Sequence, residues 1–260
     1  MIQQRPAHPP RKLPGAARLL LGGAFAAICW AAAAQAADQP FFSRYPLIDK
    51  ERWYISHGWA NGEHQSCEWR ADHVTAEDGH IRLHLTDKGG KLRPIGCAEV
   101  QSTARTRYGR YEARMRTAAG SGLNTAFFTY IGPPNGVAEH DEIDFEFLGK
   151  DPRTVQVTYW RKGKSAPATI VPLGFDASAG FHDYAFEWSP REIRWYVDGR
   201  LVHSTPKNAD LPRNPSRTYF SLWSGSAVED DWLGSFKYKS PATAEIAWTR
   251  YTPLAESSKP

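Results

Sequence analysis

The stretch that decides the fold is Asp141-Glu-Ile-Asp-Phe-Glu-Phe-Leu-Gly149. Acidic and apolar residues alternate in it, which is the pattern of a β-strand with one face in a hydrophobic core. The three apolar residues would share the core face, and the opposite face would carry Glu142, Asp144 and Glu146. The stretch therefore predicts a strand that presents three carboxyl groups in a row above a β-sheet.

Strand-like segments recur along the rest of the chain, at 81–86, 111–116, 125–131, 154–161, 182–188, 193–197, 201–204, 218–223 and 244–250. Asp198-Gly199, between two of these segments, is typical of a two-residue hairpin turn. No stretch shows an apolar stripe of helical period longer than a turn or two. Many short strands without long helices predict an all-β protein, a sandwich or jelly roll.

Charge is distributed unevenly between the N-terminal segment and the remainder. The 260-residue chain has a formal net charge of +4. The first 36 residues hold Arg5, Arg11, Lys12 and Arg18 and no acid, so the remainder carries 28 basic and 28 acidic residues. A neutral remainder argues against binding to nucleic acid through a basic surface.

Residues 1–36 are expected to be a secretory signal peptide. A basic stretch is followed by an apolar run at 19–34, and Ala34-Gln35-Ala36 forms a small-x-small cleavage site. The alternative is an uncleaved N-terminal anchor, although the run is short for a membrane span. We expect one domain at 37–260, exported and without membrane attachment after cleavage, as a secreted or periplasmic protein.

Three cysteines are present, and Cys29 would leave with the signal peptide. Cys67 and Cys97 remain as an even pair. In an oxidising compartment a disulfide is the favoured interpretation, with two buried free thiols as the alternative. Two isolated cysteines are a weak metal site.

The row of acids has two interpretations. It is either an exposed, solvated face of an antiparallel sheet or a functional site that accepts the cost of crowding like charges. Hydrolysis of a glycosidic bond with retention needs two carboxyl groups about 5–5.5 Å apart. Residues i and i+4 of a strand are about 13 Å apart at Cα, and two Glu side chains that lean together close most of that distance. The spacing of Glu142 and Glu146 therefore favours glycoside hydrolysis.

The segment Glu142-Ile-Asp-Phe-Glu146 resembles the Glu-x-Asp-x-Glu signature of family 16 glycoside hydrolases, in the form found in bacterial β-1,3-1,4-glucanases (lichenases). The resemblance covers nearly all of the chain after the signal segment. It includes Asn61-Gly62, Cys67-Glu-Trp69, Gly96-Cys-Ala-Glu99, Phe127-Phe-Thr-Tyr130, Leu173-Gly-Phe-Asp-Ala-Ser178, Trp195-Tyr-Val-Asp-Gly199 and Asp230-Asp-Trp-Leu-Gly234.

The resemblance implies a curved jelly roll of two antiparallel sheets with a substrate cleft on its concave face. It implies that Glu142 is the nucleophile, Asp144 an assisting acid and Glu146 the general acid/base, and that the paired cysteines form the family's disulfide. The positions implied to contact sugar are Asn61, Glu99, Phe128, Tyr130, Trp223 and Trp232. For each of the aromatic residues, packing in the core is the alternative.

Five cleft positions depart from the lichenase pattern. A Trp is replaced by His140, an Arg by Gln101, and an Asn by Ser221; on the strand after the acids, an Asn and a Tyr are replaced by Thr158 and Trp160. His140, Thr158 and Trp160 remain candidates for substrate contact. The departures favour related bacterial enzymes that trim succinoglycan-type exopolysaccharides, and an ordinary lichenase is the alternative. A β-1,3-glucanase (laminarinase) and a non-catalytic lectin are the more distant alternatives.

No cofactor is expected to be required, and no metal-binding residue is predicted. The family's structural calcium loses a ligand, because an Asp near the C-terminus matches Ala247, and the carbonyl of Gly79 alone would make a weak site. The expected partner is a polysaccharide substrate, and the protein is expected to be a monomer.

Overall fold

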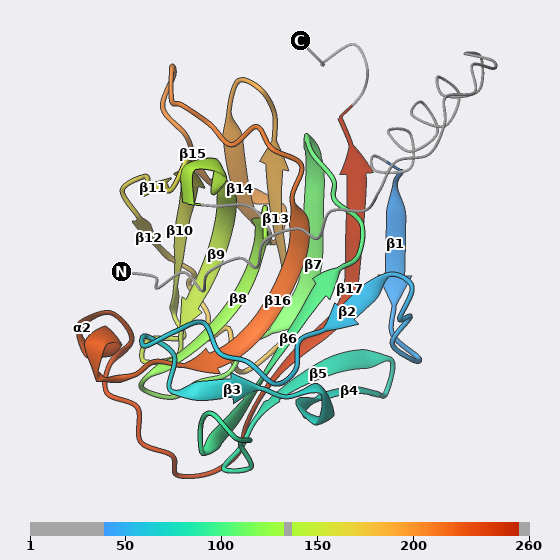
Figure 1. Cartoon of the computed structure of the whole chain (residues 1–260). Helices are drawn as coiled ribbons and strands as arrows, with labels where there is room; N and C mark the ends of the chain where they lie inside the picture. The colour runs from blue at the N-terminus through green and yellow to red at the C-terminus, as the bar shows by residue number, and fades with distance from the viewer. Residues whose placement is uncertain (1–38, 133–136, 255–260) are drawn as a thin grey trace, which may run out of the picture. The chain divides into compact units, whose positions relative to one another are not determined.

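The computed structural model describes residues 39–132 and 137–254, which form two β-sheets packed face to face (Figure 1). The expected signal peptide, 1–36, lies outside the described residues. One sheet has eight strands: β15 (Arg200–Ser204), β14 (Ile193–Val197), β13 (His182–Trp188), β7 (Gly109–Arg116), β17 (Ala242–Pro253), β5 (His80–Leu85) and β4 (Val74–Glu77) in spatial order, with β1 (Phe41–Arg44) on β17.

The second sheet has nine strands. In spatial order they are β11 (Lys164–Ser165), β10 (Thr154–Arg161), β9 (Glu142–Leu148), β8 (Leu123–Tyr130), β16 (Arg217–Ser224), β6 (Ile95–Ser102) and β2 (Trp53–Ile55), with β12 (Thr169–Pro172) on β10 and β3 (Cys67–Trp69) on β6. Pairing between the named strands is antiparallel throughout, except that β3 runs parallel to β6. Helical structure is limited to α2 (Asp230–Leu233) and the 3₁₀ turns Ala71–His73, Val137–Glu139 and Ala227–Glu229 among the described residues.

The core fills the space between the sheets with aromatic rings. Phe127 of β8 contacts Phe186 of β13 at 5.3 Å between ring centroids, and Phe147 of β9 contacts Tyr184 of β13 at 4.7 Å. These four side chains are at most 1% exposed. Each buried ring contributes about 1.5–3 kcal/mol of transfer free energy, so the apolar face of β9 fixes the direction of its acidic face.

The expected fold class is confirmed, and β9, β10, β13 and β14 have the predicted bounds. The hairpin at Asp198-Gly199 is confirmed too, because both residues have positive φ (48° and 76°) and connect β14 to β15. The strand β6 was not predicted. Its residues are almost all buried, and Gly96 and Cys97 interrupt the alternation of polar and apolar side chains.

A disulfide joins Cys67 of β3 to Cys97 of β6, with 5.8 Å between the Cα atoms. The expected pairing is therefore present, and both cysteines are fully buried. The bond fastens the segment that precedes β3 to the nine-stranded sheet.

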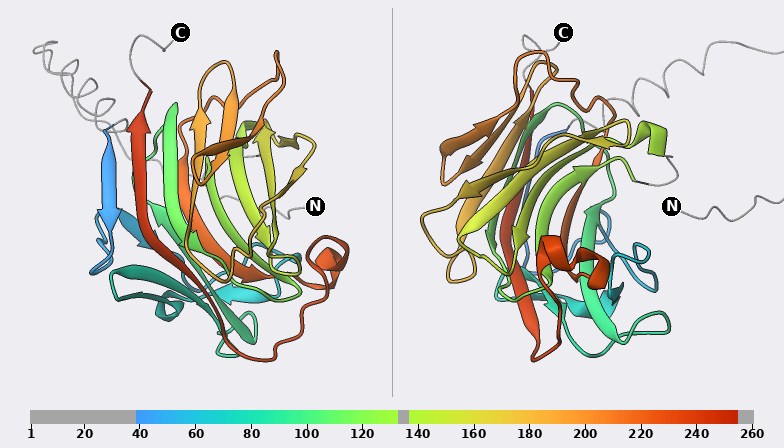
Figure 2. Two further views of the ribbon diagram at one scale, coloured as in Figure 1. Left: turned by 180° about the vertical axis from the view of Figure 1, so that it is seen from behind. Right: turned by 90° about the vertical axis from the view of Figure 1, so that its left-hand side faces the viewer.

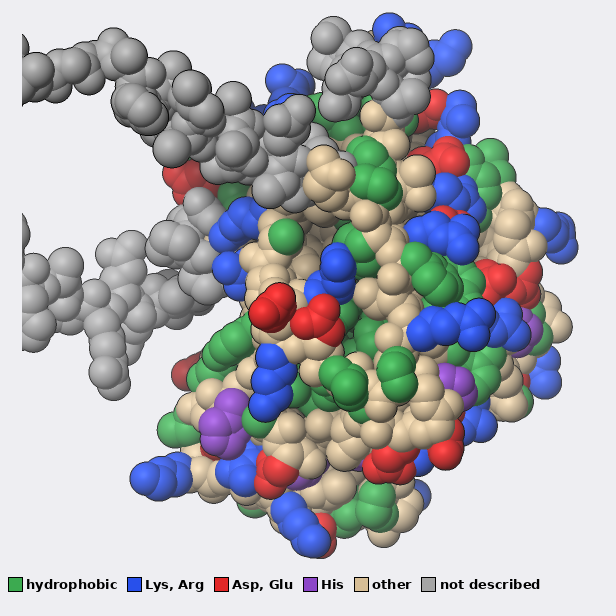
Figure 3. All heavy atoms as spheres, turned by 90° about the vertical axis from the view of Figure 1, so that its right-hand side faces the viewer, with side chains coloured by type: hydrophobic (Ala, Val, Ile, Leu, Met, Phe, Trp, Pro, Cys, Tyr) green, Lys and Arg blue, Asp and Glu red, His purple; other side chains and the backbone are tan. Residues whose placement is uncertain are grey.

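Figure 2 shows that the strands of the nine-stranded sheet are strongly curved, with α2 on their hollow side. On the face seen in Figure 3, basic and acidic side chains are interspersed and no single-sign area forms. Ion pairs also form on the eight-stranded sheet, where Arg82 of β5 pairs with Glu77, Asp78 and Glu245. No helix in the described part of the chain is long and apolar enough to cross a bilayer.

Candidate active site

Strand register brings the sequence-predicted residues together on one face of the nine-stranded sheet. On β9, Glu142, Asp144 and Glu146 alternate with three buried apolar residues. Tyr130 and Trp160 flank Glu142 in register on β8 and β10, and Phe128 and Thr158 flank Asp144 in the same way. We call this side of the sheet, with Glu99 of β6 further along it, the acidic face. It is the hollow side, because Trp232 of α2 contacts Gln156 of β10 there.

Glu146 is held by two amide donors. Asn124 Nδ2 donates to Glu146 Oε1 at 3.1 Å, and Gln156 Nε2 donates to Glu146 Oε2 at 2.7 Å. Trp232 Nε1 in turn donates to Gln156 Oε1 at 3.1 Å. Burial, and next the negative charge of Glu142, raise the pKa of Glu146 to about 7, against the two donors that lower it. Glu146 is therefore poised to exchange a proton near neutral pH.

Glu142, at the other end of the row, remains 19% exposed at its side chain. His140 Nε2 lies within hydrogen-bond distance of Glu142 Oε2, and because a carboxylate can only accept, the histidine donates. The ring of His140 stacks on Trp160 at 5.0 Å and 6°, and its edge meets Tyr130 at 4.9 Å. Two aromatic rings thus fix the orientation of the donor to Glu142.

Asp144 lies between the two glutamates and is 4% exposed. Its burial raises its pKa well above the ordinary value, and the charges of Glu142 and Glu146 and a hydrogen bond with Glu142 raise it further. These effects favour the protonated form of Asp144, which can donate a hydrogen bond to Glu142. Its Oδ2 has no hydrogen-bond partner.

Glu99 is a fourth buried carboxyl group on the acidic face, 3% exposed. Ser56 Oγ donates to Glu99 Oε1 at 2.5 Å, and Gln101 Nε2 donates to Ser56 Oγ at 3.3 Å. Burial raises the pKa of Glu99 to about 7, although the bond from Ser56 opposes the rise and Glu142 adds to it. Glu99 is thus neutral or charged according to pH across the neutral range.

The predicted aromatic residues divide between the two ends of the acid row. Tyr130 and Trp160 both contact the ring of His140, which in turn contacts Glu142. Trp223 contacts Trp232 at 6.1 Å, on the side of Glu146. Phe128, in register with Asp144, stacks on Tyr219 at 4.8 Å. All of them except Tyr219 remain partly exposed, and Trp223 also packs against the hydrophobic core.

Two candidates have other contacts. Asn61 lies in the loop before β3, where its Oδ1 accepts from Trp69 Nε1 at 3.5 Å, and its placement shows no contact with the acids. Thr158 is 7% exposed and its hydroxyl donates to the carbonyl of Ala166 at 3.1 Å. The hydroxyl of Thr158 therefore fastens the loop after β10, and a role for it in binding sugar has no support from its contacts.

Sequence reasoning missed Asn124 and Gln156, which hold Glu146, and Ser56, which holds Glu99. Each is an isolated polar residue with no motif around it. A signal was present for two of them. Gln156 has the even spacing that puts it on the same strand face as Thr158 and Trp160, and Asn124 shares a face with Phe128 and Tyr130 in the same way. Only the register of the sheet shows which acid they contact.

The residues considered for calcium fit that ion poorly. The carbonyl of Gly79 accepts a hydrogen bond from the amide of Tyr45 at 3.2 Å. Ala247 has no side-chain oxygen, and Arg44 and Arg114 line the same cavity of about 600 Å³. Within residues 39–132 and 137–254, no three His, Cys, Asp or Glu side chains converge as a metal site.

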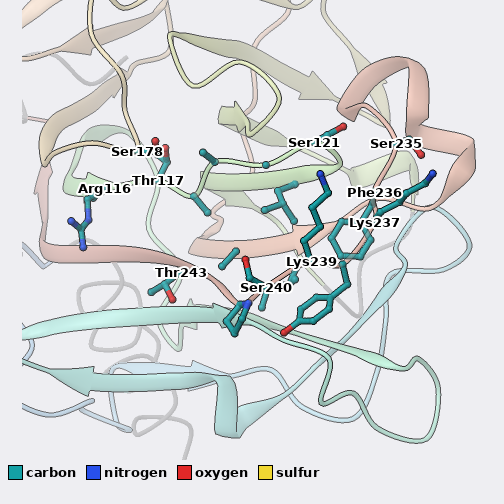
Figure 4. A pocket seen from close by; sticks show the side chains of 18 residues that line it. Arg116, Thr117, Ser121, Ser178, Ser235, Phe236, Lys237, Lys239, Ser240 and Thr243 are labelled. Atoms are coloured by element: carbon teal, nitrogen blue, oxygen red, sulfur yellow. The ribbon is translucent and has the colours of Figure 1, made fainter.

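Figure 4 shows a separate cavity of about 580 Å³ between residues 116–123 and the segment 235–243. Its lining includes Arg116, Lys237 and Lys239 with several hydroxyl groups, and none of the four carboxyl groups of the acidic face. This cavity is not part of the candidate active site.

Comparison with known proteins agrees with the fold and the site. A model of the family described as glycosyl hydrolases family 16 matches residues 61–250. The chain is 42% identical over 212 residues to the endo-1,3-1,4-β-glycanase ExoK of Rhizobium meliloti (strain 1021), covering 82% of this chain and 78% of that protein. It is also 42% identical over 217 residues to the β-glucanase of Paenibacillus macerans, covering 83% and 89%.

Solved structures match as well. A lichenase from a mouse hindgut metagenome matches with a TM-score of 0.78 at 38% identity, covering 83% of this chain and 99% of that one. A laminarinase catalytic domain from Thermotoga petrophila RKU-1 matches with a TM-score of 0.71 at 22% identity, covering 83% and 97%, and shows the shared fold alone. The jelly roll and its acid row define a glycoside hydrolase. The chain belongs to glycosyl hydrolase family 16.

Proposed function

We propose that this enzyme is an endo-acting retaining β-glycanase that cleaves glucan chains with β-1,3 and β-1,4 linkages by double displacement. The observation that carries the proposal is the arrangement of Glu146, with a pKa of about 7, on the same face as Glu142. The two carboxyl groups differ in exposure and in the side chains that donate hydrogen bonds to them. Such a difference suits the roles of nucleophile and general acid/base that retention requires. The relatives that are named for β-1,3-1,4 linkages have a higher sequence identity to this chain than the laminarinase has. This difference supports mixed-linkage glucan over β-1,3-glucan as the substrate.

In the first step, Glu142 attacks the anomeric carbon and the glycosidic bond breaks. Glu146 gives its proton to the leaving oxygen, so the departing chain leaves as a neutral alcohol. Asp144 and His140 hold the attacking carboxylate by donating to it. A glycosyl ester of Glu142 results.

In the second step, the negative charge of Glu142 is absent, which lowers the pKa of Glu146. Glu146 then accepts a proton from water as the water attacks the anomeric carbon, and Glu142 leaves as a carboxylate. Both groups return to their starting protonation states, and the anomeric configuration is retained.

The proposal includes export. A basic and apolar segment at 1–36 and a disulfide between Cys67 and Cys97 both support an oxidising compartment outside the bacterial cytoplasm. Mass spectrometry of the exported protein should find an N-terminus at Ala37.

The test of function is digestion of mixed-linkage β-glucan, with NMR of the first products. We expect new reducing ends with the β configuration, and loss of turnover in Glu142→Gln without loss of the folded state. Glu192→Gln, a change at a half-buried acid in the turn between β13 and β14, is the control and should remain active. Products of inverted configuration would contradict retention, and binding without cleavage by the unaltered enzyme would indicate a lectin.

A further inference from the structure

Arg217 lies on the acidic face, in the same cross-strand row as Glu142. It is in register with Tyr130 of β8, which is in register with Glu142 of β9. Two strand spacings of about 4.8 Å place the Arg217 backbone about 10 Å from that of Glu142. A group bound by Arg217 would therefore lie close to the bond that is cleaved.

The guanidinium of Arg217 is held above position 101. Its Nη1 donates to Gln101 Oε1 at 2.8 Å, and Gln101 is linked through Ser56 to Glu99. Position 101 is where the lichenase pattern has arginine, so β16 supplies here a guanidinium that the pattern places on β6. The loss of a charge-assisted donor expected from Gln101 is thus offset from the neighbouring strand.

In the described part of the chain, this guanidinium has no acidic partner. Among residues 39–132 and 137–254, no carboxylate forms an ion pair with Arg217, and its buried Nε has no hydrogen-bond partner. A second guanidinium, that of Arg105, lies close by and donates to the carbonyl of Ile131. Burial, and next the charge of Arg217, lower the pKa of Arg105. The charge of Arg217 on the acidic face would be neutralised by a bound anion.

We propose that Arg217 binds a carboxylate carried by a sugar unit of the polysaccharide. A guanidinium matches the planar, two-oxygen geometry of a carboxylate. The rest of the acidic face would repel such a chain, because Glu142 is negative and Glu99 and Glu146 become so above neutral pH. The arginine therefore selects where along the face a negative substituent is accepted. This inference rests on the proposed function, since it assigns the substrate class of the same site.

The experiment compares mixed-linkage β-glucan with the same glucan after partial carboxymethylation. We expect Arg217→Gln to lower kcat/KM on the carboxymethylated glucan about tenfold, the effect of losing one charge-assisted hydrogen bond, and to lower it less than about twofold on neutral glucan. Arg217→Lys should fall between Gln and the unaltered enzyme, because it keeps the charge and loses the planar fork. Arg200→Gln, which removes an exposed arginine from the eight-stranded sheet, is the matched control and should change neither value.

The outcomes separate the two proposals. Equal losses on both glucans, or no loss on the carboxymethylated glucan, would overturn the assignment of Arg217 and leave the hydrolase intact. Failure of the unaltered enzyme to cleave neutral glucan would instead contradict the proposed function. If Arg217→Gln does not fold, as judged by its melting temperature, the Lys variant supplies the decisive ratio.

Discussion

His140 donates a hydrogen bond to the carboxylate of Glu142, and the histidine ring is stacked on Trp160 at 5.0 Å between centroids. The lichenase pattern has tryptophan at position 140, which offers an indole surface to sugar. In this chain the residue at that position contacts the proposed nucleophile.

Replacing His140 by Phe should keep the stack on Trp160 and remove the donor. A hydrogen bond to a charged group is worth about 1.5–3 kcal/mol, and a nucleophile held less firmly reacts more slowly, so we expect kcat to fall about tenfold or more. KM should change little, because the exposed aromatic surface is retained. His203→Phe, on the eight-stranded sheet, is the control. A rise in KM at unchanged kcat would show that His140 acts on substrate and not on Glu142.

The pH profile should report Glu146. A general acid must carry its proton, so kcat/KM should decrease as pH rises through about 7, the pKa of Glu146. Asn124 donates to the ionised form and lowers that pKa, so Asn124→Ala should move the alkaline limb upward by about one pH unit. The measurement is kcat/KM on a soluble glucan at constant ionic strength. A limb that stays in place, or moves to lower pH, would remove Glu146 from the role of acid.

Glu99 should make the stability of the folded protein decrease as pH rises. Its pKa rises from an ordinary 4.5 to about 7 on folding, so the folded state binds the proton more tightly. The stabilisation is complete below about pH 4.5 and is lost as pH rises through 7, an effect of about 3 kcal/mol. Glu99→Gln should therefore reduce the decrease in Tm between pH 5 and pH 8. If calorimetry finds the same decrease in both proteins, the burial of Glu99 does not have this consequence.

The disulfide should stabilise the folded protein by reducing the conformational entropy of the unfolded chain. Cys67 and Cys97 are separated by 30 positions, and closing such a loop is worth about 3–4 kcal/mol in the chain-entropy model. For a domain of this size, the double change to Ser should lower Tm by roughly 10 °C. The reduced, unaltered protein should show the same loss. A shift in the variant alone would indicate damage to the packing around the cysteines.

The sequence predicted the part of the site that lies on a single strand. Glu142, Asp144 and Glu146 share a face because a strand has a period of two, and no tertiary information is needed to see it. The fold class followed from the same period repeated along the chain. Resemblance to the family supplied Glu99 and the aromatic residues.

Contacts between strands could not be predicted from the residues alone. Asn124 and Gln156 meet Glu146 only because β8 and β10 flank β9 in one particular register. The loss of arginine at Gln101 suggested a missing donor, yet Arg217, more than 100 positions away, reaches the same point. A substitution seen in the sequence can therefore suggest the loss of a functional group that a neighbouring strand in fact supplies.

The last prediction concerns substrate preference. His140 replaces an indole surface, Trp160 adds a larger ring beside it, and Arg217 adds a positive group in the row of Glu142. These differences should alter the sugar subsites and leave the acids unchanged. We expect mixed-linkage glucan to be cleaved with a lower kcat/KM than a succinoglycan-type exopolysaccharide that carries acidic substituents, because that ratio reports differential binding of the transition state. The advantage should shrink as salt is raised, since the charge of an exposed substituent is screened. A clear preference for mixed-linkage glucan at low salt would identify the enzyme as an ordinary lichenase.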